Sequence, residues 1–195
     1  MADPAYIVDG VLTDGEAWVA LASTTLTSDT SSVAFTSPDD GSSLDWSQFM
    51  DLVFIAYVRS DRGAASSDTA LQVNSDSTTA NYPMQHFYGN GSSAAASSGT
   101  GWAGFYLGNI LANNATANAF SSVVVHLFDI NSGKYKSALS QSANDNDGSG
   151  TVDMVAATWL NQAPITRLEF FGYTTHNLKD GSRFDLVGVL PRMVA

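Results

Sequence analysis

Short runs rich in Val, Phe, Tyr and Leu recur along this chain about every ten to twenty residues, and turns rich in Ser, Thr, Asn, Asp and Gly separate them. Runs of this kind begin at Asp51, Tyr82, Phe120, Val152, Ile165 and Phe184. Each fits a half-buried strand, and no amphipathic helical periodicity is sustained anywhere. The pattern therefore predicts an all-β sandwich or barrel.

The number of runs indicates which sandwich to expect. About ten strands suit a jelly-roll-like antiparallel β-sandwich better than a seven-stranded immunoglobulin domain. With 195 residues, the chain is long enough for one large β domain over residues 17–195, preceded by an extended N-terminal arm over residues 1–16. Within the sandwich we predict a short helical turn at Asp45–Phe49, an interior strand from Asp51, and a long exposed loop at Gly89–Gly101.

The N-terminal arm is polar and interrupted by glycine, but it carries isolated apolar residues. A terminal arm with apolar anchors can attach to a neighbouring chain, for example by adding a strand to an exposed sheet edge. We therefore expect the contacts with a capsid or a second subunit to come from Tyr6, Ile7, Val8, Val11 and Leu12.

Charge and composition exclude several classes of partner. The formal net charge is −11, and a nucleic-acid-binding protein needs a basic surface that this chain lacks. Anionic membrane surfaces are disfavoured for the same reason, and no run approaches the roughly 18 apolar residues of a membrane span. The chain has no cysteine, which excludes disulfides, thiolate metal sites and cysteine nucleophiles. We expect neither a nucleic-acid nor a membrane partner.

One segment resembles a calcium-binding loop. In Asp145–Asp153, the oxygen-bearing residues Asp145, Asp147, Ser149 and Asp153 take the spacing of alternate ligands around a hard cation. Position twelve of such a loop would be Ala156 instead of a bidentate Glu, and both neighbouring segments are predicted strands. A polar hairpin connection is the alternative interpretation, and any calcium site here would be weak and structural.

Signatures of catalysis are missing from the sequence. His86, His126 and His176 are scattered, and there is no Gly-Xaa-Ser-Xaa-Gly elbow, phosphate-binding loop or dinucleotide fingerprint. Glu16 and Glu169 are the only glutamates, so a carboxylate pair for glycoside hydrolysis has no support. We therefore predict a protein that is not an enzyme and needs no cofactor, apart from the weak possibility of structural calcium.

Aromatic residues flank the predicted loop at Gly89–Gly101. Trp102, Phe105 and Tyr106 could form a platform on which sugar rings stack, while polar groups of the loop bind hydroxyls. The alternative interpretation is that these aromatics pack the end of the sandwich.

The order of the strand-like segments resembles a family of tailed-phage virion structural proteins. The likeness covers nearly all of the β region and lies in the succession of the segments Trp18–Leu26, Val33–Ser37, Asp51–Ser60, Leu71–Ser77, Asn113–Phe128, Tyr135–Ser142, Trp159–Phe170 and Phe184–Val189. The arm over residues 1–16 is not part of it, and the family pattern contains no catalytic residues.

The resemblance implies a structural role in a virion. The first expectation is a head decoration (cement) protein, made in the host cytoplasm, that binds the major capsid protein on the outer capsid surface as a homotrimer. The alternative is a tail-fibre or receptor-binding module that recognises host-surface glycans. A fibre usually carries a repetitive or coiled-coil shaft, which this chain lacks, so the decoration protein is favoured.

Overall fold

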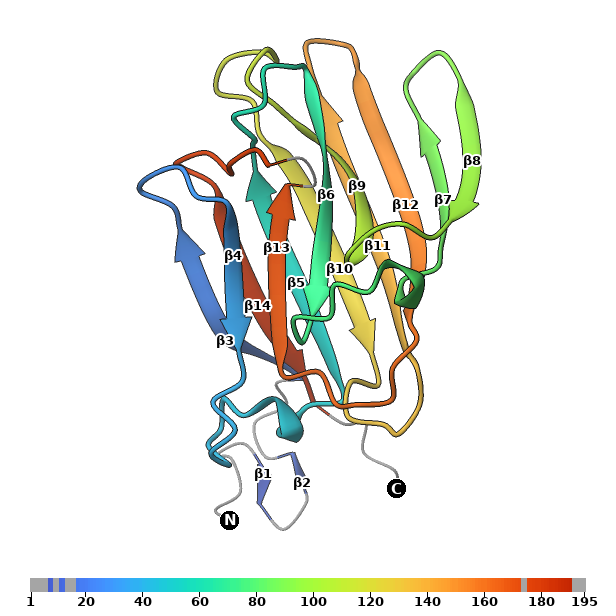
Figure 1. Ribbon diagram of the computed structural model, residues 1–195. Coiled ribbons are helices and arrows are strands. Elements are labelled where there is room, and N and C mark those ends of the chain that lie inside the picture. The colour runs from blue at the N-terminus through green and yellow to red at the C-terminus, as the bar shows by residue number, and fades with distance from the viewer. Residues whose placement is uncertain (1–6, 9–10, 13–16, 173–174, 191–195) are drawn as a thin grey trace.

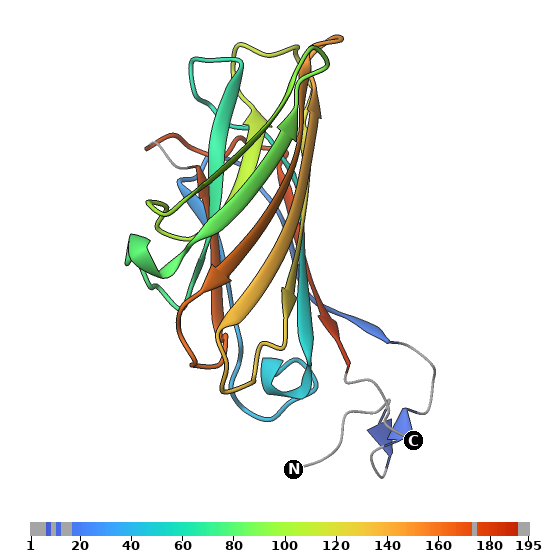
Figure 2. The same ribbon diagram turned by 90° about the vertical axis from the view of Figure 1, so that its right-hand side faces the viewer.

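The computed structural model describes residues 7–8, 11–12, 17–172 and 175–190. Two antiparallel sheets pack face to face as a β-sandwich (Figures 1 and 2), which confirms the predicted fold class. The helical elements of the described residues are two short 3₁₀ turns, η1 (Trp46–Gln48) and η2 (Thr79–Asn81). The first of them confirms the helical turn predicted at Asp45–Phe49. Within the described residues, no helix is long and apolar enough to cross a membrane.

The larger sheet contains eight strands. Their spatial order is β3 (Trp18–Thr25), β14 (Arg183–Val189), β5 (Asp51–Val58), β10 (Ser121–Phe128), β11 (Lys136–Asp145), β12 (Gly150–Trp159), β7 (Met84–Gly89) and β8 (Ala94–Gly99). The smaller sheet contains four strands, in the order β4 (Ser32–Thr36), β13 (Arg167–Gly172), β6 (Ser66–Val73) and β9 (Phe105–Leu111). A separate two-stranded sheet joins β1 (Ile7–Val8) to β2 (Val11–Leu12).

The strand order is that of a jelly roll with two added hairpins. When the hairpins β7–β8 and β11–β12 are set aside, eight strands remain, and the first pairs with the last: β3 with β14, β4 with β13, β5 with β10, and β6 with β9. This nested pairing is what a long hairpin produces when it rolls up into two sheets. Both added hairpins extend the larger sheet beyond β10, so its far strands project past the smaller sheet (Figure 1).

The core lies between the two sheets. Phe54 stacks on Phe170 at a ring-centroid distance of 5.6 Å, and Phe184 packs against both rings. The strand β10 shows the alternation that directs this packing, because Val123, Val125 and Leu127 point inward while the residues between them face outward. The strand β5 lies inside the larger sheet, between β14 and β10, as the sequence predicted.

The segment Gly89–Gly101 differs from the prediction of a long exposed loop. Residues Ala94–Gly99 form the edge strand β8, which pairs along its whole length with β7. The turn between them is held by the Asn90 side chain, whose Oδ1 accepts hydrogen bonds from the main-chain N–H groups of Ser92 and Ser93. Nearly all of β8 is exposed, so its small Ala and Ser side chains have no core to fill.

Asp76 connects three segments beside the core. Its Oδ2 accepts hydrogen bonds from the Trp159 indole N–H and from Asn81, each at 2.8 Å, and its main-chain oxygen accepts one from the Tyr82 hydroxyl at 2.9 Å. Burial raises the pKa of the Asp76 carboxyl, but the hydrogen bonds from Trp159, Asn81 and Thr78 outweigh burial and hold the pKa below its ordinary value. The ionised carboxylate therefore stabilises the fold.

We expect Asp76→Ala to lower the free energy of unfolding by about 1–3 kcal/mol at neutral pH, because it leaves the buried Trp159 N–H without its acceptor. A carboxyl whose pKa is lower in the folded state contributes stability that is present above its unfolded value, about 3.9, and is lost as the pH falls. The difference between wild type and variant should therefore shrink below about pH 4 in urea unfolding. A deficit that stays constant from neutral to acid pH would contradict this role of the carboxylate.

Candidate functional site

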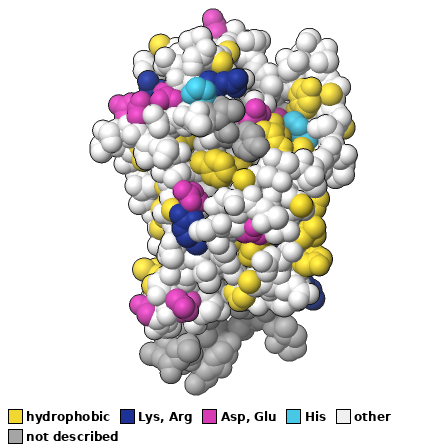
Figure 3. Space-filling view, in the orientation of Figure 1, with side chains coloured by type: hydrophobic (Ala, Val, Ile, Leu, Met, Phe, Trp, Pro, Cys, Tyr) yellow, Lys and Arg dark blue, Asp and Glu magenta, His cyan; other side chains and the backbone are white. Residues whose placement is uncertain are grey.

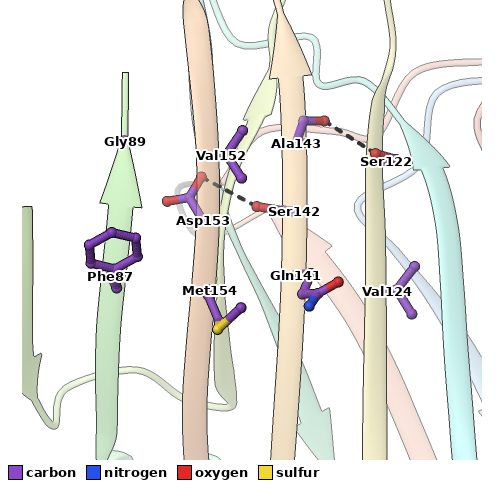
Figure 4. A pocket seen from close by; sticks show the side chains of 10 residues that line it. All are labelled: Phe87, Gly89, Ser122, Val124, Gln141, Ser142, Ala143, Val152, Asp153 and Met154. Carbon is purple, nitrogen blue, oxygen red and sulfur yellow. Dashed lines mark hydrogen bonds between the residues drawn. The ribbon is translucent and has the colours of Figure 1, made fainter. Parts of the chain in front are cut away.

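His86, Asp153 and Ser142 form a polar cluster on the inner side of the larger sheet. The Nε2 atom of His86 lies 2.7 Å from Oδ1 of Asp153. Figure 4 shows the second contact, in which the Ser142 hydroxyl donates to Oδ2 of Asp153 at 3.4 Å. The three residues come from β7, β12 and β11, which the sheet places side by side. All three are buried, and Asp153 is only 1% exposed.

This cluster has the residue types of a catalytic triad but a different arrangement. A triad needs the serine hydroxyl bonded to the histidine so that the imidazole can take its proton. Here Ser142 is bonded to the carboxylate instead, and the same carboxylate binds His86 through its other oxygen. Gly108 of β9 covers the cluster closely, because a Cβ atom placed on it would lie 2.5 Å from the Ser142 hydroxyl. The geometry fits a scaffold that fastens three strands.

Aromatic rings pack around His86. The imidazole stacks on Tyr88 and meets Tyr106 edge-on, each at a centroid distance of 5.1 Å, and Trp102 lies 4.3 Å from Tyr106. The Tyr106 hydroxyl donates to Asp68 at 3.1 Å. Burial raises the pKa of Tyr106 well above its ordinary value, and the nearby carboxylates of Asp68 and Asp153 act in the same direction. Tyr106 therefore stays protonated as a hydrogen-bond donor.

The glycan platform predicted from Trp102, Phe105 and Tyr106 does not form as a surface. Phe105 is fully buried and packs edge-on against Tyr82, and Tyr106 is 6% exposed. Trp102 is half-buried. The reason is that β9 belongs to the smaller sheet, packs over β11 and β12, and is buried along nearly its whole length, so neither Phe105 nor Tyr106 is left at the surface. The alternative interpretation, in which these aromatics pack the sandwich, describes Phe105 and Tyr106 better.

The four residues predicted to bind calcium do not converge. Asp145 and Asp147 are exposed at the turn between β11 and β12, where Oδ1 of Asp145 accepts a hydrogen bond from the Gly148 N–H. The hydroxyl of Ser149 donates to the main-chain oxygen of Asn146. Asp153 lies further along β12, opposite Ser142, with its carboxylate directed into the buried cluster. Among the described residues, no group of three or more His, Cys, Asp or Glu side chains is placed to hold a metal ion.

Two buried cations bind main-chain carbonyl groups. The guanidinium of Arg59 donates to the carbonyl oxygens of Asn113, Ala115, Thr116 and Ala119, and so closes the loop that precedes β10. At the other end of the sandwich, the Lys136 ammonium binds the carbonyls of Ser132, Lys134 and Gln162. Desolvation lowers the pKa of Lys136, against the opposing effect of Asp129. Both cations hold loops in place.

The arm residues expected to make contacts lie partly outside the described residues. Tyr6 is outside them, whereas Ile7 and Val8 pair with Leu12 and Val11 in the β1–β2 sheet. Figures 1 and 2 place this strand pair beyond one end of the sandwich, and it joins neither of the two large sheets.

The outer face of the larger sheet is the feature that the sequence analysis missed. Phe87, Val124, Val152 and Met154 point outward from adjacent strands and surround Gln141 (Figure 4). They line a shallow, open depression of about 440 Å³, and Val152 remains 64% exposed. The sequence does contain a signal for this face. In β10 and β12, apolar residues occur at odd and at even positions, which predicts that both the outer face and the core face of these strands are apolar.

Comparisons with known proteins do not indicate a function, so the functional assignment rests on the residues and their geometry. No protein-family model matches the chain, and no curated protein matches it.

Proposed function

We propose that this chain is a non-enzymatic virion structural protein of a tailed phage, most specifically a decoration protein that binds the major capsid protein on the outer surface of the head. The proposal rests on the order of strand segments that resembles this class of protein, together with the jelly-roll sandwich and its acidic charge of −11. A protein that binds only the assembled shell stabilises that shell by its binding free energy, and many copies act together.

The observation that carries the proposal is the separate β1–β2 sheet. Its strands Ile7–Val8 and Val11–Leu12 are apolar in sequence and pair with each other outside both sheets of the sandwich. A strand pair held apart from the core of its own chain is suited to contact another chain, either by packing or by strand addition.

The polar residues inside the sandwich support a role without catalysis. His86, Asp153 and Ser142 are sealed between the sheets, and Arg59 and Lys136 are engaged with main-chain carbonyls. Recognition of host glycans, the alternative function, has less support because Phe105 and Tyr106 lie inside the sandwich.

The test is binding of the purified full-length protein to expanded, undecorated heads of its phage. We expect the arm variant Ile7→Ser/Val8→Ser/Val11→Ser/Leu12→Ser to bind at least about tenfold more weakly, because it removes apolar contacts worth more than about 1.4 kcal/mol. Thermal stability should be unchanged, since β1 and β2 belong to neither large sheet. Co-sedimentation with heads measures the binding. Equal binding by the arm variant and the wild type would contradict the role of the arm.

A further inference from the structure

The outer side of β7, β8, β10, β11 and β12 forms one continuous surface, here called the apolar sheet face. Cross-strand pairing places its outward residues in rows, and one row runs from Phe87 through Met154 and Gln141 to Val124. The exposed large hydrophobic residues on it are Phe87, Val124, Phe128, Leu139, Val152 and Met154. Soluble proteins rarely expose a contiguous apolar patch of this size unless another molecule covers it.

The same face lacks charge. The chain contains 27 Lys, Arg, Asp and Glu residues in total, 8 basic and 19 acidic. The structure describes all residues of these five strands. Among their outward-facing residues, the only Lys, Arg, Asp or Glu is Asp145, at the end of β11. His126 also points outward and is bonded to Asp51 at 3.0 Å. By contrast, Figure 3 shows charged side chains of both signs on the opposite face, over the smaller sheet.

The absence of charge indicates the partner. A basic partner would be recognised by acidic groups on this surface, but the face offers none apart from Asp145 at its border. A second copy of this chain carries the same charge of −11, so two copies can approach closely only through surfaces that carry no charge themselves. Apart from Asp145 at its border, the apolar sheet face meets that condition, and its exposed apolar side chains supply the driving force.

The size of the face is sufficient for a specific contact. Five strands spaced about 4.8 Å apart, with about seven residues of about 3.3 Å each, cover about 550 Å² per copy. Two such faces in contact bury about 1,100 Å², which exceeds the roughly 1,000 Å² expected of a biological interface. We infer that the apolar sheet face packs against a second copy of this chain. This inference does not rest on the proposed capsid role.

Charge substitutions at Gln141 test it, because this exposed residue lies at the centre of the face and its replacement removes no core contact. Gln141→Glu and Gln141→Lys should each weaken self-association at least about tenfold in sedimentation velocity, since each places like charges at the contact. An equimolar mixture of the two variants should associate again. The control Thr36→Glu adds the same charge at an exposed position of β4, beside Arg167, and should associate like the wild type.

Three results would overturn the inference. They are a wild-type protein that stays monomeric up to about 1 mM, Gln141 variants that associate as strongly as the wild type, and a control that dissociates as they do. Circular dichroism of each variant verifies that the fold is intact. None of these measurements involves phage heads. The result on self-association can therefore be interpreted even if the capsid proposal fails.

Discussion

Gly108→Ala is expected to lower the free energy of unfolding by about 3–5 kcal/mol. Gly108 has a φ of +93°, a backbone conformation that costs an L-residue free energy. The added Cβ would also lie 2.5 Å from the Ser142 hydroxyl and 2.7 Å from Cβ of Asp153. Both contacts involve the buried cluster, and the neighbouring strands would have to move apart to admit the methyl group.

Urea unfolding followed by tryptophan fluorescence measures this loss. The matched control is Gly99→Ala on the edge strand β8, where an added Cβ meets no atom within 4 Å. The control should change stability by no more than about 0.5 kcal/mol. If Gly108→Ala unfolds at the same urea concentration as the wild type, β9 does not approach β11 and β12 closely enough for an added Cβ atom to clash with Ser142 and Asp153.

Asp153→Ala is the second substitution with a large expected effect, about 3–5 kcal/mol, because it breaks a buried pair and leaves His86 and Ser142 without their common acceptor. The double variant His86→Ala/Asp153→Ala should lose less stability than the sum of the two single variants, since the two residues contact each other. The control Asp180→Ala removes an exposed carboxylate and should be nearly neutral.

The two explanations of Asp153 make opposite predictions. If its role is to hold β7 and β11 to β12, the loss of stability is the same with and without calcium. A wild-type melting temperature that rises with added calcium, and no longer does so in Asp153→Ala, would instead support the calcium site predicted from the sequence spacing.

Much of the fold can be predicted from the sequence, because the alternation of apolar residues along a strand indicates which side chains face the core. Val123, Val125 and Leu127 alternate with outward residues, and the hairpin that joins β10 to β11 follows from a short turn with glycine. The strand β8 could not be predicted in this way, since Ala and Ser carry no periodic signal and pairing with β7 decides its conformation.

The sites were harder to predict because they depend on contacts distant in sequence. His86 and Asp153 are 67 residues apart, and the sequence alone gives no reason to pair them. The calcium-like spacing placed Asp153 with Asp145, but the parity of β12 turns the Asp153 carboxylate into the sandwich. Phe105 stands beside a stretch of Gly and Ser in the sequence, yet it lies in the core because β9 crosses over the larger sheet.

The arm and the apolar sheet face fit a single arrangement. If the β1–β2 sheet grips the shell and the sheet face joins neighbouring copies, each bound copy would favour the next by raising its effective concentration. Two identical faces packed together give a dimer with two-fold symmetry, so the homotrimer expected from the family resemblance would need a different contact. Sedimentation velocity, which gives the number of copies, distinguishes the two assemblies.

The most direct test of the central claim is cryo-electron microscopy of intact virions that carry this protein, with the copy number per particle measured by quantitative mass spectrometry. We predict hundreds of copies arrayed on the icosahedral lattice of the head, with the β1–β2 sheet against the major capsid protein. A few copies confined to the tail, or no copies in the particle, would contradict the proposal of a head decoration protein.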